Sequence, residues 1–333
     1  MTRQRIPDDV LSAAHARSKA RAARDWPEAD RLRATIESAG WRIVDRGTDF
    51  ALSPAAAADE TDGGRVRYGS SRSVPSRLEE PPTGLATIIL VATEWPDDLQ
   101  RALDALRTTT PAGLSVVIVA DGPSAAQADA LETLAEAQPG DDRQDPPIEI
   151  VWTSERLGHA AALNAGMRRA TAPVAVLLDT SVEPIGDVVS PLAHAFDDPS
   201  VAAAGGWGIT SGDLRKFEDS PAGDVDAIEG YALAFRRADA AARGPLDEHF
   251  RFYRNLDIWW SLVLRDEGEG NTPRRAVRLD GLPAVRHEHR GYTSLPDDER
   301  DRQSKRNFYR IIDRFGSRRD LLVHPAVAGA PRG

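Results

Sequence analysis

The sequence predicts an α/β protein built on a doubly wound, mostly parallel sheet. Short apolar runs alternate along the chain with helical segments, and this rhythm is typical of parallel strands covered by helices. The run from Val174 to Leu178 is unbroken and apolar, as in a strand buried on both faces of such a sheet. It ends at Asp179, and open α/β sheets bind ligands beyond the carboxyl ends of their strands. We therefore expect a ligand site at Asp179.

The first fifty residues predict a helical hairpin followed by two short strands. The helical pattern covers residues 8–39, is interrupted before Pro27, and stops at Gly40, a residue that favours helix ends. Residues 41–45 and 48–52 then have the composition of two strands joined by a turn. We expect these elements to form a small module of their own.

This module contains a residue pattern that occurs in a known family. The pattern consists of Ala16-Arg17, Ala22-Ala23-Arg24-Asp25-Trp26, Ala29-Asp30-Arg31-Leu32-Arg33, Gly40-Trp41, Asp45 and Gly47-Thr48. Residues 16–53 thereby resemble the small C-terminal subdomain of cysteinyl-tRNA synthetases, which lies at the anticodon end of those enzymes. The resemblance implies the same fold for residues 1–53. That family's catalytic signatures and zinc-binding cysteines do not occur in this sequence.

The charge of the module does not favour RNA as its partner. Residues 1–50 carry ten Lys and Arg against eight Asp and Glu, so they attract phosphate groups weakly. RNA contact through residues 1–53 is therefore the lesser alternative. Packing, or docking of another partner, is the role we favour.

Residues 54–83 predict a flexible linker between the module and the rest of the chain. They are rich in Ala, Ser, Gly, Arg and Pro and contain few large apolar side chains. Such a segment buries too little apolar surface to offset the conformational entropy that it would lose on ordering.

The main domain is expected over residues 84–318, followed by a tail over residues 319–333. Its predicted strands are 85–93, 115–120, 148–152 and 174–178, and its predicted helices are 97–107, 125–137, 158–170 and 297–314. The last helix has apolar residues at helical spacing among alternating charges, so we expect it to close the domain with one face in solvent.

Six motifs follow one another along this domain. They are Thr93-Glu94-Trp95, Asp121-Gly122-Pro123-Ser124, Gly158-His159-Ala160-Ala161-Ala162-Leu163-Asn164-Ala165-Gly166, Leu177-Leu178-Asp179-Thr180-Ser181, Glu229-Gly230-Tyr231-Ala232-Leu233-Ala234-Phe235-Arg236-Arg237, and Gly244-Pro245-Leu246-Asp247-Glu248-His249-Phe250. With these motifs, residues 85–316 resemble family 2 glycosyltransferases of the GT-A fold. The resemblance implies transfer of a sugar, of the hexosyl type, from a nucleotide-sugar donor to an acceptor hydroxyl. It also implies inversion and a Mg²⁺ or Mn²⁺ cofactor.

The motifs indicate which residues would bind the donor. The expected nucleotide-sugar-binding residues are Thr93, Asp121, Arg156, Gly158, Asn164 and Asp179. Asp121 ends a predicted strand and can accept hydrogen bonds from a base or a ribose, which is the role the resemblance implies. Arg156 can pair with phosphate through its guanidinium group. Each has a plainer alternative, Asp121 as a turn residue and Arg156 as a surface charge.

The expected metal ligands are Asp179, Ser181, His287 and His289. Asp179 matches the first carboxylate of the Asp-x-Asp signature of the family, whereas Ser181 replaces the second and is a weaker ligand. His287 and His289 would share one face of a strand and could supply what Ser181 lacks. An exposed, charged loop is the alternative for the two histidines.

The acceptor side also departs from the family signature. Asn255 stands where the family has its catalytic aspartate, and an amide cannot accept a proton at neutral pH. We therefore expect Asp257 to be the general base, with Asp247 in reserve. The expected acceptor-binding residues are Glu229, Gly230 and Trp259, the last by stacking on a sugar ring. The acceptor itself is expected to be a glycan or another component of the cell envelope.

Composition limits the remaining possibilities. A net charge of −10 argues against broad nucleic-acid binding, and the lack of cysteine excludes disulfides, thiolate metal sites and cysteine nucleophiles. No apolar run approaches the ~20 residues of a spanning helix. We expect a cytoplasmic protein, peripheral at most to the inner face of the membrane. Because Ser181 and Asn255 are altered, the main alternative is a non-catalytic protein that binds sugar nucleotides or glycans on the same fold. An RNA-associated protein is the second alternative.

Overall fold

The computed structural model describes residues 6–47, 49–55, 57–109, 111–137 and 146–325 of the 333-residue chain. The chain divides into two compact units, Met1–Ala57 and Ala58–Gly333. Among the helices of the described ranges, none is long and apolar enough to cross a membrane. Residue 48 of the second predicted strand and the end of the predicted tail lie outside the described residues.

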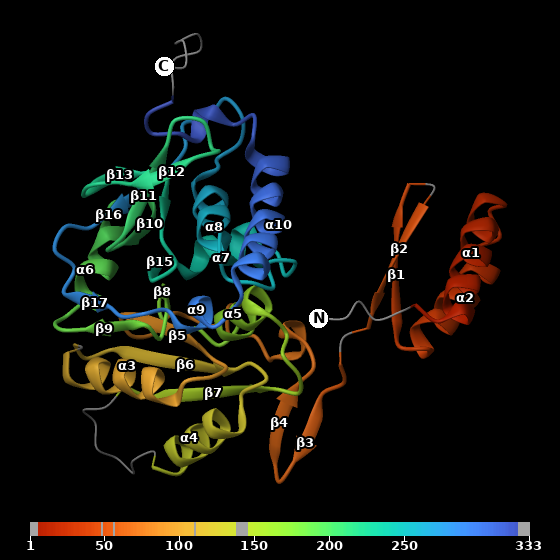
Figure 1. Ribbon diagram of the computed structural model, residues 1–333, viewed down its shortest axis with the longest axis horizontal. Helices are drawn as coiled ribbons and strands as arrows, with labels where there is room; N and C mark the ends of the chain where they lie inside the picture. Colours follow the sequence, from red (N-terminus) through yellow and green to blue (C-terminus); the bar gives the residue numbers. More distant parts are fainter. Residues whose placement is uncertain (1–5, 48, 56, 110, 138–145, 326–333) are drawn as a thin grey trace. The chain divides into compact units, whose positions relative to one another are not determined.

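The first unit is a helical hairpin packed on a two-stranded sheet, as the sequence predicts (Figure 1). Its elements are α1 (Asp8–Ala22), α2 (Trp26–Ser38), β1 (Trp41–Arg46) and β2 (Asp49–Pro54). Asp25 caps α2, because its side chain accepts the N–H of Glu28 at 3.2 Å. The unit has a hydrophobic core of its own, made of Val10, Ala14, Ile36, Trp41 and Ile43.

Residues 58–83 belong to the second unit, so the prediction of a flexible linker over residues 54–83 is wrong for them. They form β3 (Glu60–Asp62), β4 (Arg65–Tyr68) and the 3-10 turn η1 (Ser71–Ser73), and β4 pairs in parallel with β7 (Ile148–Thr153). Val74 is fully buried, and its carbonyl accepts a hydrogen bond from Arg168 at 2.6 Å. The composition was misleading because a segment that joins an existing sheet edge needs few apolar side chains of its own.

Ten strands of the described residues form one sheet, in the order β13-β16-β10-β15-β8-β5-β6-β7-β4-β3. The strands not yet given are β5 (Ala86–Ala92), β6 (Leu114–Ala120), β8 (Val174–Leu178), β10 (Val201–Gly205), β13 (Gly223–Val225), β15 (Ala232–Arg236) and β16 (Arg275–Arg278). The central strands β8, β5, β6, β7 and β4 run parallel, while β15 is antiparallel to both β8 and β10. The predicted mostly parallel sheet is confirmed.

Helices cover both faces of this sheet (Figure 1). The helices of this unit are α3 (Pro96–Thr109), α4 (Ala125–Glu136), α5 (His159–Met167), α6 (Val189–His194), α7 (Arg237–Arg243), α8 (Leu256–Arg265), α9 (Arg290–Thr293) and α10 (Asp297–Phe315), with 3-10 turns η2 (Ala195–Asp197) and η3 (Arg319–Leu321). Of these, α9 buries no residue. Successive residues of β5 enter two different cores. Ile88 belongs to the core that contains residues of α3, α4 and α6, and Ile89 to the core that contains residues of α5, α8 and α10. The helices predicted from the sequence are confirmed.

Two small sheets and the end of the chain complete the unit. Strands β11 (Gly208–Ser211), β12 (Phe217–Asp219) and β14 (Ala227–Ile228) form one sheet, and β9 (Val182–Pro184) pairs with β17 (Ala284–Arg286) to form the other. The predicted tail is corrected in its first residues. Leu321 and Leu322 are buried, and the N–H of Val323 donates to Asp226 at 2.7 Å. These apolar side chains fill the core, so the domain extends past residue 318.

The order of the strands reverses at β5. Strands β6 and β7 follow on one side of β5, whereas β8 pairs with β5 on the other side. Open α/β sheets bind their ligands at such a reversal, outside the carboxyl ends of the strands. The fold therefore predicts a ligand site among the residues that follow β5, β6 and β8.

Candidate functional site

Backbone hydrogen bonds hold the ends of β5 and β6 together. The N–H of Asp121 donates to the carbonyl of Ala92 at 3.1 Å, and the N–H of Ser124 donates to the carbonyl of Thr93 at 2.8 Å. Thr93 and Asp121, both predicted to bind the donor, therefore lie at neighbouring strand ends.

Asp121 is buried and holds the following loop against the end of its own strand. Its carboxylate accepts the N–H of Leu157 at 2.6 Å and the N–H of Gly158 at 3.2 Å. Burial raises the pKa of Asp121, and the two N–H groups oppose that rise. Because a carboxylate has about four lone-pair positions, Asp121 can still accept a hydrogen bond from a ligand.

Gly122 allows the loop to approach this closely. Its φ is +53°, and a Cβ at this position would lie 2.7 Å from the backbone nitrogen of Arg156. The side chain of Arg156 is exposed, and its ion-pair partner Glu94 is 3.5 Å away. An exposed guanidinium group with a distant partner remains available to bind phosphate.

The structure corrects the role predicted for Asn164. Its amide nitrogen donates to the carbonyl of Leu246 at 2.9 Å and to Glu248 at 3.1 Å, while its amide oxygen accepts the N–H of Leu246 at 2.9 Å. Asn164 therefore fixes this loop and has no amide group left for a nucleotide. Gly166, in the same motif, lets α5 pack on β5, since a Cβ there would lie 2.5 Å from Ile89.

Asp179 follows β8 and accepts hydrogen bonds from two sides. Ser181 donates its N–H at 2.8 Å and its hydroxyl at 2.5 Å to one carboxylate oxygen, and Nε2 of His289 lies 3.1 Å from the other. Burial alone would raise the pKa of Asp179, but the contacts with His289 and Ser181 outweigh it and hold that pKa below its ordinary value. Asp179 is therefore ionised at neutral pH, as a cation ligand must be.

The ring of His289 is fixed from further sides. Its Nδ1 accepts the N–H of Tyr292 at 3.1 Å and caps α9, and its ring stacks on Tyr253 with 4.2 Å between the ring centroids. The ring of Tyr253 also forms a T-shaped contact with the ring of His159, with 6.1 Å between the ring centroids. Burial lowers the pKa of His159 to about 4, so this ring is neutral at pH 7. Sequence reasoning missed His159, although its place directly after Gly158 was an available signal.

The two histidines predicted to act as a pair contact different carboxylates. Nε2 of His287 lies 2.6 Å from Glu183, whereas His289 faces Asp179. Strand β17 ends at Arg286, so the two rings do not share the face of a strand. Within the residues that the structure describes, no group of three or more His, Cys, Asp or Glu side chains is arranged to hold a metal ion.

A divalent cation fits at Asp179 with fewer protein ligands than predicted. Mg²⁺ is commonly held by one or two carboxylates together with phosphate oxygens and waters. The hydroxyl of Ser181 is donated to Asp179. Because Nδ1 of His289 accepts an N–H, the neutral ring carries its proton on Nε2 and donates toward Asp179. Asp179 is thus the protein ligand that fits, and His289 orients it.

Asp257, the predicted base, lies in the first turn of α8. Its Oδ2 accepts the N–H of Gly230 at 2.8 Å, and its Oδ1 accepts the N–H of Ile258 at 2.9 Å. Burial raises the pKa of Asp257, although both N–H groups oppose this. The structure therefore brings Asp257 and Gly230 together, as residues that were both assigned to the acceptor side.

Glu229 lies next to Gly230, and its contact with the protein is longer than those of Asp257. Its ion pair with Arg286 spans 3.7 Å, and the guanidinium carbon of Arg286 lies 4.6 Å from the ring centroid of Tyr231 and 5.3 Å from that of Trp207. The carbonyl of Tyr231 accepts the N–H of Asp179 at 3.0 Å, so this cluster adjoins the end of β8. The sequence does not indicate that Trp207 and Arg286 lie beside Glu229, because they belong to segments that are distant in the chain.

Asp247 and Asn255 make contacts with α10. Oδ1 of Asp247 accepts the backbone N–H of His249 at 3.0 Å and lies 2.6 Å from Nδ1 of the same residue. Its Oδ2 accepts the Nε–H of Arg310 at 3.1 Å. Burial opposes ionisation, but these partners hold the pKa of Asp247 below its ordinary value, which makes it a weak base. Asn255 has a φ of +68°, and its amide donates to the carbonyl of Ser304 at 3.0 Å. Both side chains are thereby tied to α10.

The structure also corrects the stacking role predicted for Trp259. This side chain is only 5% exposed and packs against Phe250 and Trp260, with ring centroids 5.6 and 6.1 Å away. Its rings therefore belong to the core and present no face to a sugar.

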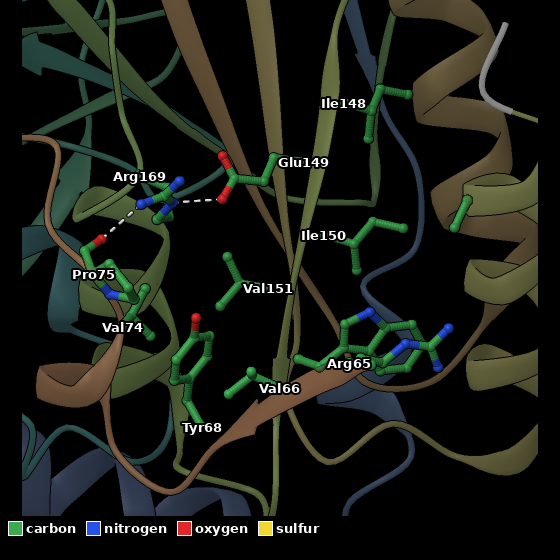
Figure 2. A pocket seen from close by; sticks show the side chains of 12 residues that line it. Arg65, Val66, Tyr68, Val74, Pro75, Ile148, Glu149, Ile150, Val151 and Arg169 are labelled. Atoms are coloured by element: carbon green, nitrogen blue, oxygen red, sulfur yellow. Dashed lines mark hydrogen bonds and ion pairs between the residues drawn. The ribbon is translucent and has the colours of Figure 1, made fainter. Parts of the chain in front are cut away.

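A separate groove of about 720 Å³ opens beside β4 and β7 (Figure 2). The charged side chains that line it are paired: Arg169 with Glu149 and with the carbonyl of Pro75, and Arg65 with Glu132. None of the predicted site residues lines this groove. It offers no unpaired cation for a phosphate group, so the ligand site is assigned to the ends of β5, β6 and β8.

Comparisons with known proteins identify the family and the fold of this domain. The sequence model of the family described as glycosyl transferase family 2 matches residues 87–253, just over half of the chain. The structure of mannosyltransferase PcManGT from Pyrobaculum calidifontis, in complex with GDP-Man and Mn²⁺, matches with a TM-score of 0.52 at 18% identity, over 75% of this chain and 71% of that one. The structure of GalNAc-T7 with UDP, GalNAc and Mn²⁺ matches with a TM-score of 0.54 at 13% identity, over 69% of this chain and 48% of that one, so this chain spans about half of its length. No match was found among the curated proteins.

Proposed function

The chain belongs to glycosyl transferase family 2 and has the GT-A fold, and from this we propose that it transfers a hexosyl group from a nucleotide-sugar donor to an acceptor hydroxyl. The observation that carries the proposal is the position of Asp121 and Asp179 at the strand ends beside the reversal of strand order. The same edge has an available guanidinium group, that of Arg156. A base, a ribose and a diphosphate need this combination of acceptors and cations.

In this proposal the nucleotide lies along the ends of β5 and β6. Asp121 accepts a hydrogen bond from the base or the ribose, with Thr93 beside it, and Arg156 pairs with the diphosphate. Gly158 has a φ of +99°, and a Cβ there would lie 3.1 Å from Arg251, so the missing side chain lets these two segments pack together. The contact of Gly158 with the nucleotide stays a prediction. The two similar structures support this proposal, since one was solved with GDP-Man and the other with UDP.

A divalent cation, Mn²⁺ or Mg²⁺, would be held by Asp179 together with the diphosphate. It would supply positive charge to the leaving group as the glycosyl bond breaks. Both similar structures contain Mn²⁺, which supports this part of the proposal. Within the chain, His289 and Ser181 keep Asp179 ionised and oriented for that task.

We propose an inverting displacement as the stereochemical course. Such a reaction needs a base to accept the proton of the acceptor hydroxyl. Two carboxylates adjoin the end of β8 on the acceptor side, Glu229 and Asp257. Burial raises the pKa of both, which suits proton acceptance near neutral pH. The acceptor is proposed to be a glycan or another cell-envelope component.

The test is turnover of defined donors by the purified full chain. GDP-mannose, UDP-glucose and UDP-GalNAc are each incubated with Mn²⁺, and release of the nucleoside diphosphate is measured with and without simple glycosides as acceptors. Calorimetry with GDP and UDP then compares Mn²⁺ with EDTA, and we expect tighter binding with the metal. Absence of binding to both nucleotides would contradict the proposal. Binding without turnover would identify a nucleotide-binding protein that lacks catalysis.

The role of the first unit stays a prediction, as does a cytoplasmic location or one at the inner face of the membrane. Two of its arginines are already paired with one carboxylate, since Arg17 lies 2.6 Å and Arg21 lies 3.3 Å from Asp45. This pairing leaves less positive charge for RNA phosphates. We therefore propose packing or partner docking for this unit. Its resemblance to the cysteinyl-tRNA synthetase subdomain stays a prediction from the sequence.

A further inference from the structure

The turn between β14 and β15 brings Glu229 beside the proposed donor site. The N–H of Glu229 donates to the carbonyl of Trp207 at 3.0 Å, and two residues later the carbonyl of Tyr231 accepts the N–H of Asp179 at 3.0 Å. Since Asp179 follows β8 directly, these bonds hold the turn next to the strand end where the sugar phosphate would lie.

The carboxylates of Asp257 and Glu229 differ in the number of hydrogen bonds that they accept from the protein. Both oxygens of Asp257 accept backbone N–H groups, from Gly230 at 2.8 Å and from Ile258 at 2.9 Å. Glu229 accepts no hydrogen bond from the described residues, and its ion pair with Arg286 spans 3.7 Å. The Glu229 side chain is 22% exposed, so a substrate can reach it. The two N–H groups stabilise the charge of Asp257 and hold the turn, whereas no hydrogen bond from the described residues stabilises the charge of Glu229. Glu229 is therefore the carboxylate better suited to take up a proton.

We propose that Glu229 is the general base that accepts the proton of the acceptor hydroxyl, and that Asp257 is a positioning residue that holds the turn bearing Glu229. This inference rests on the proposed glycosyl transfer and reassigns the roles expected from the sequence, where Asp257 was the base and Glu229 bound the acceptor. Arg286 is the cation that faces Glu229. Its guanidinium group lies over Tyr231 and Trp207 and is thereby fixed beside Glu229.

The step balances without any further reagent. The acceptor oxygen forms a bond to the anomeric carbon of the donor sugar, and the bond from that carbon to the phosphate oxygen breaks. The electron pair of the broken bond leaves with the nucleoside diphosphate. The hydroxyl proton passes to a carboxylate oxygen of Glu229 and is later released to water.

The surroundings of Glu229 set the pH at which it can act. Burial raises its pKa, and the negative charges of Asp257 on α8 and of Asp219 on β12 raise it further. Arg286 on β17 and Arg278 on β16 oppose the rise. A base must be deprotonated, so turnover should fall as the pH drops through the raised pKa of Glu229.

The experiment measures kcat and KM against pH for the full chain, first as wild type and then as variants. Glu229→Gln should lower kcat by about 10²–10⁴-fold, which is the usual contribution of a general base. The affinity for GDP or UDP and the melting temperature should stay at their wild-type values. Glu229→Asp should restore part of the activity. Glu218→Gln, a change of the same type at an exposed glutamate on β12, is the matched control.

Two further variants distinguish Glu229 from its neighbours by the direction of a pH shift. Asp257→Asn removes a negative charge, so the acid limb of the profile should move to lower pH. Because Asn can accept only one of the two backbone N–H groups, kcat should also fall, but by less than in Glu229→Gln. Arg286→Met removes a positive charge, so the acid limb should move to higher pH. Loss of turnover in Asp257→Asn, with full activity in Glu229→Gln, would overturn the assignment. Absence of turnover in the wild type would instead refute the proposed function, which the donor assay establishes first.

Discussion

A backbone hydrogen bond joins the turn after β8 to the turn before β15. The two turns nevertheless shift the pKa of their carboxylates in opposite directions. Asp179 receives two hydrogen bonds from Ser181 and faces His289, and its pKa is held below the ordinary value. Glu229 has a distant cation and a neighbouring carboxylate, and its pKa is raised. In the proposed site, the two turns would therefore supply a permanent anion and a proton acceptor.

This difference shows how one residue type serves two tasks. A carboxylate that anchors a cation must stay ionised at every working pH, and hydrogen-bond donors ensure this. A carboxylate that accepts a proton works best when its pKa is nearer neutrality, and burial beside like charge achieves that. Asp121, buried and bonded to two N–H groups, lies between these cases.

The largest effect is expected from removing the permanent anion. Asp179→Asn keeps the shape of the side chain but removes the charge, so turnover should fall by about 10³-fold, in the range found for lost electrostatic groups in active sites. The gain in GDP or UDP affinity on adding Mn²⁺ should also disappear. Asp280→Asn, at an exposed position, is the control. If Asp179→Asn retained that gain, Asp179 would not be the cation ligand, and the contrast between the two turns would lose its basis.

A second prediction concerns the loop that Asp121 holds. Gly122→Ala should lower the free energy of unfolding by about 1–3 kcal/mol, because its φ of +53° and the approach of Arg156 both oppose a side chain. Gly63→Ala has nearly the same φ, +55°, and open space around it. The difference between the two variants in chemical denaturation isolates the close approach. Equal losses in the free energy of unfolding would show that the Arg156 loop can move away from residue 122, and that the close approach of the two segments is not needed for stability.

A third prediction uses the buried histidine of the donor side. His159 has its pKa lowered to about 4 from 6.5, so between these values the unfolded chain binds a proton that the folded chain does not. Stability should therefore fall as the pH drops through this window, by no more than about 1.4 kcal/mol per pH unit for one proton. NMR titration of the His159 ring gives the pKa directly.

Substitution of this histidine provides the control for the pH effect. His159→Asn should flatten the dependence of stability on pH in the same window. A His159 ring that titrates near its ordinary pKa would mean that this part of the donor side is open to water.

The smallest effect is expected from removal of the first unit. Deletion of residues 1–57 should leave the melting temperature of the remaining domain and its affinity for GDP or UDP nearly unchanged, because each unit has its own core. The cut keeps Ala58 and Asp59, whose oxygens accept hydrogen bonds from Ser154 and from Gly69. Insoluble protein, or a marked loss of nucleotide affinity, would show that the unit takes part in the site.

The sequence by itself determined the elements and the edge of the sheet at which the ligand site is proposed. Apolar runs such as Val174–Leu178 are interpretable locally, because burial on both faces of a sheet requires apolar side chains at every position. The strand-end carboxylates Asp121 and Asp179 follow from the same runs. Of their hydrogen-bond partners, Gly158 and Ser181 belong to the motifs, and Leu157 directly precedes one of them.

The tertiary structure alone decided which polar side chains remain available. Asn164 belongs to a motif, yet the Leu246 loop, 82 residues away, occupies its amide. Residues 58–83 look like a linker by composition, but the free edge of β7 orders them. Glu229 was distinguished from Asp257 only by the backbone N–H groups that reach one and not the other. A hydrogen bond between distant segments depends on where the whole chain places them, and neither composition nor local spacing contains that information.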